Sequence, residues 1–400
     1  MNPNSNSFCI LSHVGVYNDA IDGNMFPCCV IDPNKSAFTG NKNVNKLNDY
    51  FTSDYHQYLV NSLDNNIKIP ECSTCWSKEN VNLPIFRQEK NNNLLGDKKF
   101  TSNWISLFSK KQQTSSPLLF ADLKFSNICN YTCAMCNPHN STKIYSQWVL
   151  KPDAPHIKEF LANNPNYMSR VKNYTKNNRH SLLEDVLKHD IKILSITGGE
   201  PLLDEKILQI LSNLSDLKKS KISLTFVTNG SVDLISTANK LGKFKYIKFV
   251  ISIEGYDKLN DYVRIGSDWD FLSSNIINAQ KNNISISVHT IIQSLSIHKL
   301  HETITWCENN KLDQEFVYLE TPYELSCNML PKHHIDSITS KLPQNVVDYI
   351  NNNYTDCSDQ IEKLKYFINW HEKITKIKLN EVNNSLNNIL ENQVGNKDAN

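Results

Sequence analysis

From about residue 117 onward, short apolar runs alternate with longer amphipathic segments. Short apolar runs bounded by turn residues indicate buried strands, and amphipathic segments of this length indicate helices. Six runs are expected to be strands: Leu118–Ser126, Ile191–Thr197, Ile222–Thr228, Tyr246–Glu254, Ile284–Ile292 and Glu315–Thr321. Because strands that alternate with helices favour a parallel sheet, the fold class is expected to be α/β, a partial (β/α)6 barrel of the TIM type.

The chain on either side of this segment has a different pattern. The run Val14–Tyr17 and the run that ends at Cys28 are joined by an Asp-Gly turn, which predicts a β-hairpin, and a helix is expected between about Lys46 and Asp64. After the barrel the chain is rich in Asn and Lys and has helical stretches such as Gln360–Lys378. The expected division is a hairpin-and-helix domain at 1–85, a polar connector at 86–116, the barrel at 117–325, and a C-terminal helical extension with a frayed tail at 326–400.

Composition restricts the partners and the compartment. The 400 residues include 42 Lys and Arg against 41 Asp and Glu, so no overall field favours nucleic acid or an anionic membrane. The N-terminus has neither the basic nor the apolar region of a signal peptide, and no stretch reaches the roughly 20 apolar residues of a membrane span. We therefore expect a cytoplasmic protein, in which eleven cysteines indicate metal ligands rather than disulfides.

Three of these cysteines follow the first barrel strand at close spacing. Cys129, Cys133 and Cys136 lie within eight residues, and three thiols on one tight loop can hold three corners of an iron–sulfur cube. Structural zinc takes four protein ligands, so the spacing favours a cluster over zinc. The fourth iron would stay open, and a ligand with an amine and a carboxylate can chelate it.

A second cysteine set lies in the first ninety residues. Cys9 and Cys28 fall on the predicted hairpin, and Cys72 and Cys75 form a knuckle after the helix. Four thiols can enclose a metal completely, and both a zinc ribbon and a fully ligated cluster satisfy that count. Cys29 points to the opposite face of its strand from Cys28, so we expect it to be a packing thiol.

Polar and glycine residues gather where the predicted strands end. Gly198 and Gly199 let the backbone approach a ligand, and Glu200 offers an acceptor for an ammonium group, although a Gly-Gly pair is also an ordinary turn. Asn229 suits a hydroxylated ligand, with an Asn-Gly turn as the alternative. Chemistry in parallel barrels gathers at the carboxyl ends of strands, which is where these residues fall.

The later strands add further candidates. Ser252 and Glu254 share one parity and are expected to face the barrel interior, and Arg264 follows closely enough to clamp a carboxylate beside Ser252. On the fifth strand, His289 shares its parity with serines and is expected to line the lumen as a substrate contact or proton acceptor; a hydrogen-bonded core histidine is the alternative. Tyr318 and Glu320 share one parity of the sixth strand and are expected to reach substrate.

The cysteine spacing, the Gly-Gly-Glu-Pro turn, the Thr-Asn-Gly strand end and the Ser-Ile-Glu-Gly segment with its arginine resemble the radical S-adenosylmethionine (SAM) enzymes over roughly residues 118 to 322. The resemblance implies a 4Fe–4S cluster on the three barrel cysteines, with SAM chelated to the open iron and cleaved by one electron to a 5′-deoxyadenosyl radical. It implies these SAM contacts: Gly198, Gly199 and Glu200 at the methionine amine, Asn229 and Glu254 near the ribose, Ser252 and Arg264 at the carboxylate, and Met135 near adenine.

The N-terminal set resembles the twitch module, a shortened relative of the SPASM domain, on Cys9, Gly23, Cys28, Cys72 and Cys75. The module usually follows the barrel, whereas here it precedes it. The resemblance implies an auxiliary 4Fe–4S cluster that transfers electrons to or from the active site, and a flavodoxin- or ferredoxin-type electron donor.

These features favour a radical SAM oxidoreductase or related radical catalyst that acts on a small polar substrate such as a sugar or aminocyclitol. A peptide-modifying maturase is the alternative; such enzymes often carry a leader-binding winged-helix domain before the barrel, and the hairpin beginning at Phe8 leaves no room for one. A metal-stapled binding protein without turnover is the competing class, and it predicts that SAM does not bind.

Overall fold

The computed structural model describes residues 5–392 except 20, 84, 97–117, 152–153 and 177–178. These residues form an eight-stranded sheet in the order β10-β9-β7-β6-β5-β3-β1-β2 and a two-stranded sheet of β4 and β8. The strands are β1 Gly15–Asn18, β2 Met25–Phe26, β3 Phe120–Lys124, β4 Thr132–Cys133, β5 Ile193–Thr197, β6 Ser223–Thr228, β7 Tyr246–Ser252, β8 Arg264–Ile265, β9 Ser285–Ile292 and β10 Asp313–Tyr318. In the large sheet every neighbouring pair is parallel except β1 with β2. All six predicted barrel strands are therefore confirmed.

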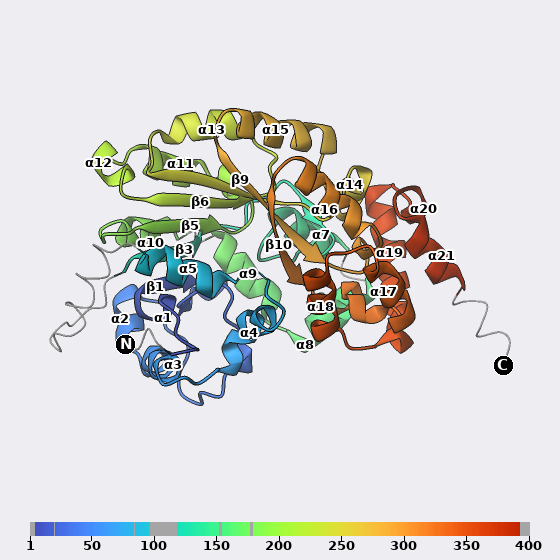
Figure 1. The fold of residues 1–400 in the computed structure, drawn as a ribbon, viewed down its shortest axis with the longest axis horizontal. Helices are drawn as coiled ribbons and strands as arrows, with labels where there is room; N and C mark the ends of the chain where they lie inside the picture. Colours follow the sequence, from blue (N-terminus) through green and yellow to red (C-terminus); the bar gives the residue numbers. More distant parts are fainter. Residues whose placement is uncertain are drawn as a thin grey trace.

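Helices connect and cover these strands (Figure 1). The helices before and beside the cysteine loop are α1 Leu11–Val14, α2 Leu47–Thr52, α3 Asp54–Asp64, α4 Ser73–Glu79, α5 Phe86–Leu95, α7 Thr142–Leu150, α8 Pro155–Asn163, α9 Tyr167–Lys176 and α10 His180–Val186. Those that connect the later strands are α11 Glu205–Ser212, α12 Asp216–Lys219, α13 Leu234–Leu241, α14 Lys258–Val263, α15 Trp269–Lys281 and α16 Leu300–Asn309. The C-terminal helices are α17 Lys332–Thr339, α18 Gln344–Asn353, α19 Ile361–Thr375, α20 Leu379–Val382 and α21 Asn384–Asn392.

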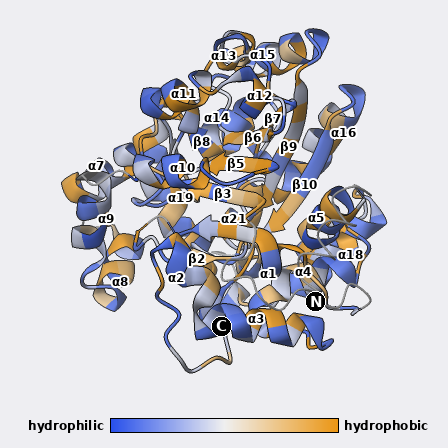
Figure 2. Ribbon diagram, turned by 90° about the vertical axis from the view of Figure 1, so that its left-hand side faces the viewer, coloured by the Kyte–Doolittle hydropathy of each residue, from blue (hydrophilic) through white to orange (hydrophobic). Residues whose placement is uncertain are grey.

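Alternation along each barrel strand separates a helix-facing side from an inner side. On β5, Leu194 and Ile196 are fully buried against the helices, whereas Ser195 and Thr197 are only half-buried. On β7, Phe249 and Ile251 are likewise buried while Lys248 and Ser252 point inward. Figure 2 shows hydrophobic colours concentrated on the central strands and mixed colours on the surrounding helices. Because side chains alternate with a period of two, each strand presents its polar residues to the inside of the barrel.

The N-terminal hairpin is present, but it does not stand apart from the barrel. β1 and β2 pair antiparallel as predicted, and β1 also pairs in parallel with β3, so that the hairpin extends the barrel sheet. The Asn18 amide donates to the Lys124 carbonyl at 2.7 Å and accepts from the Lys124 N–H at 2.9 Å, which fixes this junction. The hydrophobic core around Cys9 and Cys28 includes Phe120 of β3. The first residues of the chain are therefore part of the barrel wall.

The remaining predicted segments are confirmed with changes. The helix expected between Lys46 and Asp64 is two helices, because Ser53 leaves the helical conformation and its hydroxyl accepts from the His56 N–H at 3.2 Å as the cap of α3. Residues 86–95 of the predicted connector form α5, and residues 97–116 lie outside the described part of the chain. The helix predicted at Gln360–Lys378 is α19. Within the described ranges, no helix combines the length and apolar character needed to cross a bilayer.

Candidate functional site

A single cavity of about 1180 Å³ occupies the interior of the barrel. The inner faces of β3, β5, β6, β7, β9 and β10 line it on one side, and α4 and α5 line it on the other. The N-terminal helices thus close the open side of the partial barrel (Figure 1). Its volume exceeds the roughly 300–1,000 Å³ of an ordinary small-molecule site, so it has room for a cofactor and a second ligand together.

The three barrel cysteines lie together at this cavity. Cys129, Cys133 and Cys136 all line it, and Cys133 is 9% exposed. Burial raises the pKa of the Cys133 thiol to about 11 and that of Cys136 to about 12, and the thiols raise one another's pKa further. Among the described residues, no three His, Cys, Asp or Glu surround a point where one metal ion would sit. Clustered thiols of this kind suit a soft, multi-atom metal group better than a single ion.

Arg264 lies directly beside this loop because of the small antiparallel sheet. β4 and β8 pair Cys133 with Arg264, and the Arg264 Nη1–H donates to Glu254 Oε1 at 2.9 Å. Glu254 is fully buried, so burial raises the pKa of its carboxyl to about 7 while Arg264 opposes the rise. The buried Arg264 Nε has no hydrogen-bond partner among the described residues. One guanidinium edge is therefore fixed, and a free donor remains beside the thiols for an acceptor such as a carboxylate.

Ser252 lines the cavity with Arg264, but Glu254 does not. β7 ends at Ser252, and the chain then leaves strand geometry, which breaks the parity that was expected to turn Glu254 inward. Its second oxygen, Oε2, accepts from the Ile291 N–H at 2.7 Å. The prediction that Glu254 faces the interior near a ribose is wrong in placement; this carboxylate holds Arg264 and the end of β9.

The Gly-Gly turn packs against the cysteine loop. Gly198 has a φ of +136°, and a Cβ at Gly199 would come 2.2 Å from the Ile128 carbonyl oxygen. The Gly199 N–H donates to the Ser126 carbonyl at 3.2 Å, and both glycines line the cavity. Glycine is therefore required here by backbone conformation and by the close approach of the preceding loop.

Glu200 has a different position from the one expected. Its carboxylate is fully buried and accepts from the Leu202 N–H at 3.0 Å, the Thr228 hydroxyl at 2.7 Å and the Asn229 N–H at 2.7 Å. It is not among the residues that line the cavity. The prediction that this carboxylate meets an ammonium group is wrong in placement, because the end of β6 already uses its oxygens.

Asn229 and Met135 both line the cavity near the thiols. The Asn229 Nδ2 donates to Asn130 Oδ1 at 2.9 Å and lies 3.9 Å from the Cys129 Sγ. Met135 is 8% exposed beside Cys136. Their proposed contacts with ribose and adenine stay predictions.

The three candidate catalytic residues lie in different environments in the structure. His289 lines the cavity, and burial together with Lys78 and Arg264 lowers its pKa to about 4, so the imidazole is neutral near pH 7. Tyr318 is 6% exposed in the core, and its hydroxyl donates to Asn328 Oδ1 at 2.7 Å. Glu320 is exposed and pairs with Lys35 at 3.5 Å. The expected parity of the sixth strand is wrong, because Glu315 and Val317 of β10 line the cavity instead.

The four N-terminal thiols lie in the same region of the structure, and their predicted role as ligands of one metal group stays a prediction. Cys9, Cys28 and Cys75 are buried and Cys72 is half-buried. Burial is the main cause of the raised pKa of Cys28, and the thiols of Cys9, Cys75 and Cys72 add to it. Cys75 lines the cavity that the barrel cysteines line. The barrel cysteines and one member of the N-terminal set, Cys75, therefore border one space.

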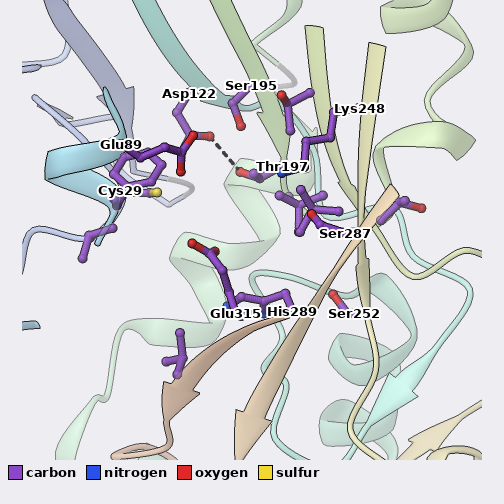
Figure 3. Close-up of a pocket in the computed structure, with 18 of the residues that line it drawn as sticks. Cys29, Glu89, Asp122, Ser195, Thr197, Lys248, Ser252, Ser287, His289 and Glu315 are labelled. Atoms are coloured by element: carbon purple, nitrogen blue, oxygen red, sulfur yellow. Dashed lines mark hydrogen bonds between the residues drawn. The ribbon is translucent and has the colours of Figure 1, made fainter. Parts of the chain in front are cut away.

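Cys29 is not the packing thiol that the strand pattern predicts. Its side chain is exposed to the cavity, yet deep enough that burial and the carboxylate of Asp122 raise its pKa well above the ordinary value. Figure 3 shows Cys29 beside Glu89 and Asp122 on one wall, with Lys248 across the cavity. The turn after β2 carries Cys28 into the core and Cys29 toward the barrel interior.

The structure adds polar residues that the sequence analysis did not select. Asp122, Ser195, Thr225, Lys248 and Glu315 all line the cavity from strand positions. The alternation that indicated His289 marks the same inward parity on the other strands. The charged lining residues are Lys78, Lys90, Lys124, Lys192, Lys245, Lys248, Arg264, Glu89, Asp122, Asp313 and Glu315.

Comparison with known proteins finds a family profile that matches the central part of the chain. Residues 123–307 match the sequence profile of the Radical SAM superfamily. A curated relative, GTP 3′,8-cyclase of Clostridium perfringens (strain SM101 / Type A), is 26% identical over 133 residues, which cover 32% of this chain and 40% of the relative.

Two solved structures are similar at low scores. SuiB of Streptococcus suis bound to S-adenosylmethionine is 18% identical, with 76% of this chain and 62% of that chain covered and a TM-score of 0.39. Native anSMEcpe with bound AdoMet is 15% identical, with 58% and 61% covered and a TM-score of 0.38. The chain thus spans less than two thirds of the length of each of these proteins. The profile match covers the cysteine loop and most of the strand ends that build the cavity, so this part of the chain, residues 123–307, is similar to the radical SAM superfamily.

Proposed function

We propose that this chain is a radical SAM enzyme that abstracts a hydrogen atom from a small polar substrate bound inside the barrel. When bound, a 4Fe–4S cluster and SAM would together supply one-electron cleavage of SAM to a 5′-deoxyadenosyl radical. The observation that carries the proposal is that the three barrel cysteines, together with Cys75 of the N-terminal set, border one cavity, which has room for SAM and a substrate. A purely structural metal site has no need of such a cavity.

The residues around the barrel cysteines fit this cofactor pair. Cys129, Cys133 and Cys136 would ligate the cluster, leaving one iron for SAM. The free Nε of Arg264 and the hydroxyl of Ser252 would hold the SAM carboxylate, because both face the cavity beside the thiols.

The other contacts follow from backbone and amide groups. The backbone of Gly198 and Gly199 would let SAM approach the loop closely, since neither carries a side chain that would fill this space. Asn229 would lie near the ribose and Met135 near the adenine, as their positions in the cavity wall allow. Glu200 and Glu254 act indirectly, by holding the end of β6 and the Arg264 side chain.

The N-terminal thiols would hold an auxiliary 4Fe–4S cluster. After burial, the thiols of Cys9, Cys75 and Cys72 raise the pKa of Cys28, and those of Cys9 and Cys75 raise the pKa of Cys72, which supports a shared site for the four thiols. Since Cys75 also faces the cavity, electrons can pass between this site and the substrate. A flavodoxin- or ferredoxin-type protein is the class of donor that this chemistry needs.

The substrate proposed is a polar small molecule. Hydroxyl and charged side chains from six strands face the cavity, which favours a ligand rich in hydrogen-bonding groups over an apolar one. The name of the curated relative specifies a nucleotide substrate, GTP, which belongs to that general class. Oxygen-rich metabolites of similar size are the compounds to screen first.

The test is anaerobic reconstitution with iron and sulfide, followed by dithionite and SAM. We expect 5′-deoxyadenosine from the wild type, detected by liquid chromatography, and none from Cys133→Ala. Cys307→Ala is the matched control, because Cys307 is a buried thiol outside both cysteine sets and should leave the product unchanged. Iron-loaded wild-type protein that forms no 5′-deoxyadenosine would contradict the proposal.

A further inference from the structure

A band of polar side chains crosses the inner wall of the barrel below the strand ends. The register pairs Asp122 with Ser195, Ser195 with Thr225, and Thr225 with Lys248, so one residue from each of β3, β5, β6 and β7 lies at the same level. All four line the cavity. We propose that this band, with the Lys248 ammonium at its β7 end, is a recognition site for an oxyanion of the substrate, a carboxylate or a phosphate. The inference rests on the proposed function for the identity of the bound molecule as substrate.

Among the described residues, Lys248 has no ionic partner, in contrast to Lys90 and Lys192 of the same cavity wall. Lys90 pairs with Glu89 at 2.7 Å, and Lys192 pairs with Asp190 at 2.9 Å. Lys124 lies against Asp122, which raises its pKa. Within the described residues, the half-buried Lys248 makes neither an ion pair nor a hydrogen bond. Partial burial of an ammonium group without a partner is unfavourable in free energy, and a bound anionic ligand offsets that unfavourable free energy.

The net positive charge of the cavity wall also favours an anionic ligand. Seven Lys and Arg side chains but four Asp and Glu side chains line it among the described residues, while the entire chain carries 42 positive and 41 negative side chains. The positive excess is therefore concentrated in this cavity. A cleft lined mainly by one sign of charge raises the local concentration of the opposite sign.

The neighbours of Lys248 in the band carry hydroxyl groups that can donate hydrogen bonds to an oxyanion. Thr225 is adjacent to it in the register, and Ser195 is next along the band. Hydroxyl donors beside a point-like ammonium match the several acceptor oxygens of a carboxylate or phosphate. A neutral polyol would satisfy the hydroxyls but would leave the Lys248 charge unpaired.

The position of the band along the strands implies that the substrate is elongated. Lys248 precedes Ser252 by four strand residues, which corresponds to about 13 Å along the strand at roughly 3.3 Å per residue. The thiols and Arg264 lie at the Ser252 end. The oxyanion and the carbon that loses hydrogen are therefore expected at opposite ends of an elongated molecule.

Oxyanion binding is measured on anaerobically reconstituted protein without SAM or reductant. Inorganic phosphate and succinate are titrated separately at constant ionic strength, and the thermal unfolding midpoint gives the affinity. We expect at least one of them to raise the midpoint of the wild type. In Lys248→Met the affinity for that anion should fall at least about tenfold, as expected for a lost charge-assisted hydrogen bond.

Two further variants separate charge from packing. Lys248→Arg keeps the charge and should retain the binding, and Lys243→Met is the matched control, because Lys243 is exposed and outside the cavity wall. If Lys248→Met does not fold, Lys248→Gln takes its place. Binding of phosphate alone assigns a phosphorylated substrate, binding of succinate alone a carboxylated one, and binding of both supports the oxyanion site in general.

The proposal is overturned if neither anion shifts the wild-type midpoint, or if Lys248→Met shows the wild-type shift. Because the titration involves no SAM cleavage, a failure to form 5′-deoxyadenosine would count against the proposed function and leave this result standing.

Discussion

Glu200 gives a direct choice between the role indicated by the sequence and the role shown by the structure. The sequence predicts a carboxylate that contacts the SAM amine, whereas the structure has it buried and bonded to the end of β6. The informative perturbation is Glu200→Gln, which keeps the size of the side chain and removes its charge. One of the two terminal positions then carries an NH₂ group facing an N–H or O–H donor, so at least one bond is lost.

The loss of unfolding free energy in Glu200→Gln can be estimated from the three hydrogen bonds that the Glu200 carboxylate accepts. Hydrogen bonds to a buried carboxylate contribute about 1.5–3 kcal/mol each, and an orphaned buried donor adds its own desolvation. We expect Glu200→Gln to lower the free energy of unfolding by about 3 kcal/mol. Thr228→Val removes the 2.7 Å bond from the other side and should cost about 2 kcal/mol.

The assay is a double-mutant cycle in urea unfolding of the metal-free protein, followed by circular dichroism. Because Glu200 and Thr228 share one bond, the double variant should be less destabilised than the sum of the single variants, by about 1.5–2 kcal/mol. Additive costs would show that the bond contributes nothing. Unchanged stability of Glu200→Gln together with lost SAM binding in equilibrium dialysis would refute the structural role and restore the direct contact.

Three other outcomes are expected. Gly199→Ala should reduce the iron content from about eight to about four per chain in an iron assay, because its Cβ would clash with the Ile128 carbonyl and displace the cysteine loop; retention of all the iron would count against this packing. Glu320→Ala should change the free energy of unfolding by less than about 1 kcal/mol and leave 5′-deoxyadenosine formation intact, since it makes an exposed ion pair with Lys35; loss of the product would return it to the active site. The urea midpoint should fall as pH drops from 6.5 toward 4, because buried histidines with pKa lowered to about 3 or 4 take up protons only on unfolding, and a pH-independent midpoint would contradict their burial. These histidines are His56, His139, His156, His289, His298 and His371.

Local sequence patterns were sufficient for the strands and for the position of the three barrel cysteines at one cavity. The six barrel strands follow from alternation, which depends only on neighbouring residues. The spacing of Cys129, Cys133 and Cys136 brings the thiols together because so little chain separates them. Cys9 and Cys75 are far apart in sequence, yet the Cys75 thiol lies near enough to raise the pKa of Cys9 after the larger effect of burial.

Tertiary contacts decide the positions that were predicted wrongly. Glu200 and Glu254 were assigned to ligands because a carboxylate near a strand end resembles a binding group, but neighbouring strands supply donors that no local pattern reveals. The parity of Tyr318 depends on where the sixth strand begins, and β10 presents Glu315 to the cavity instead. The pairing of β1 with β3, which turns the N-terminal module into part of the barrel wall, is likewise a long-range contact.

Electron paramagnetic resonance of the dithionite-reduced, reconstituted protein tests the central claim most directly. Two cysteine sets, with the barrel cysteines and Cys75 bordering one cavity, predict two iron–sulfur signals, of which one changes when SAM is added. Cys133→Ala should remove the signal that responds to SAM, and Cys75→Ala should remove the other. Absence of any SAM-sensitive signal from iron-loaded wild-type protein, or zinc in place of iron at the N-terminal set, would contradict this account.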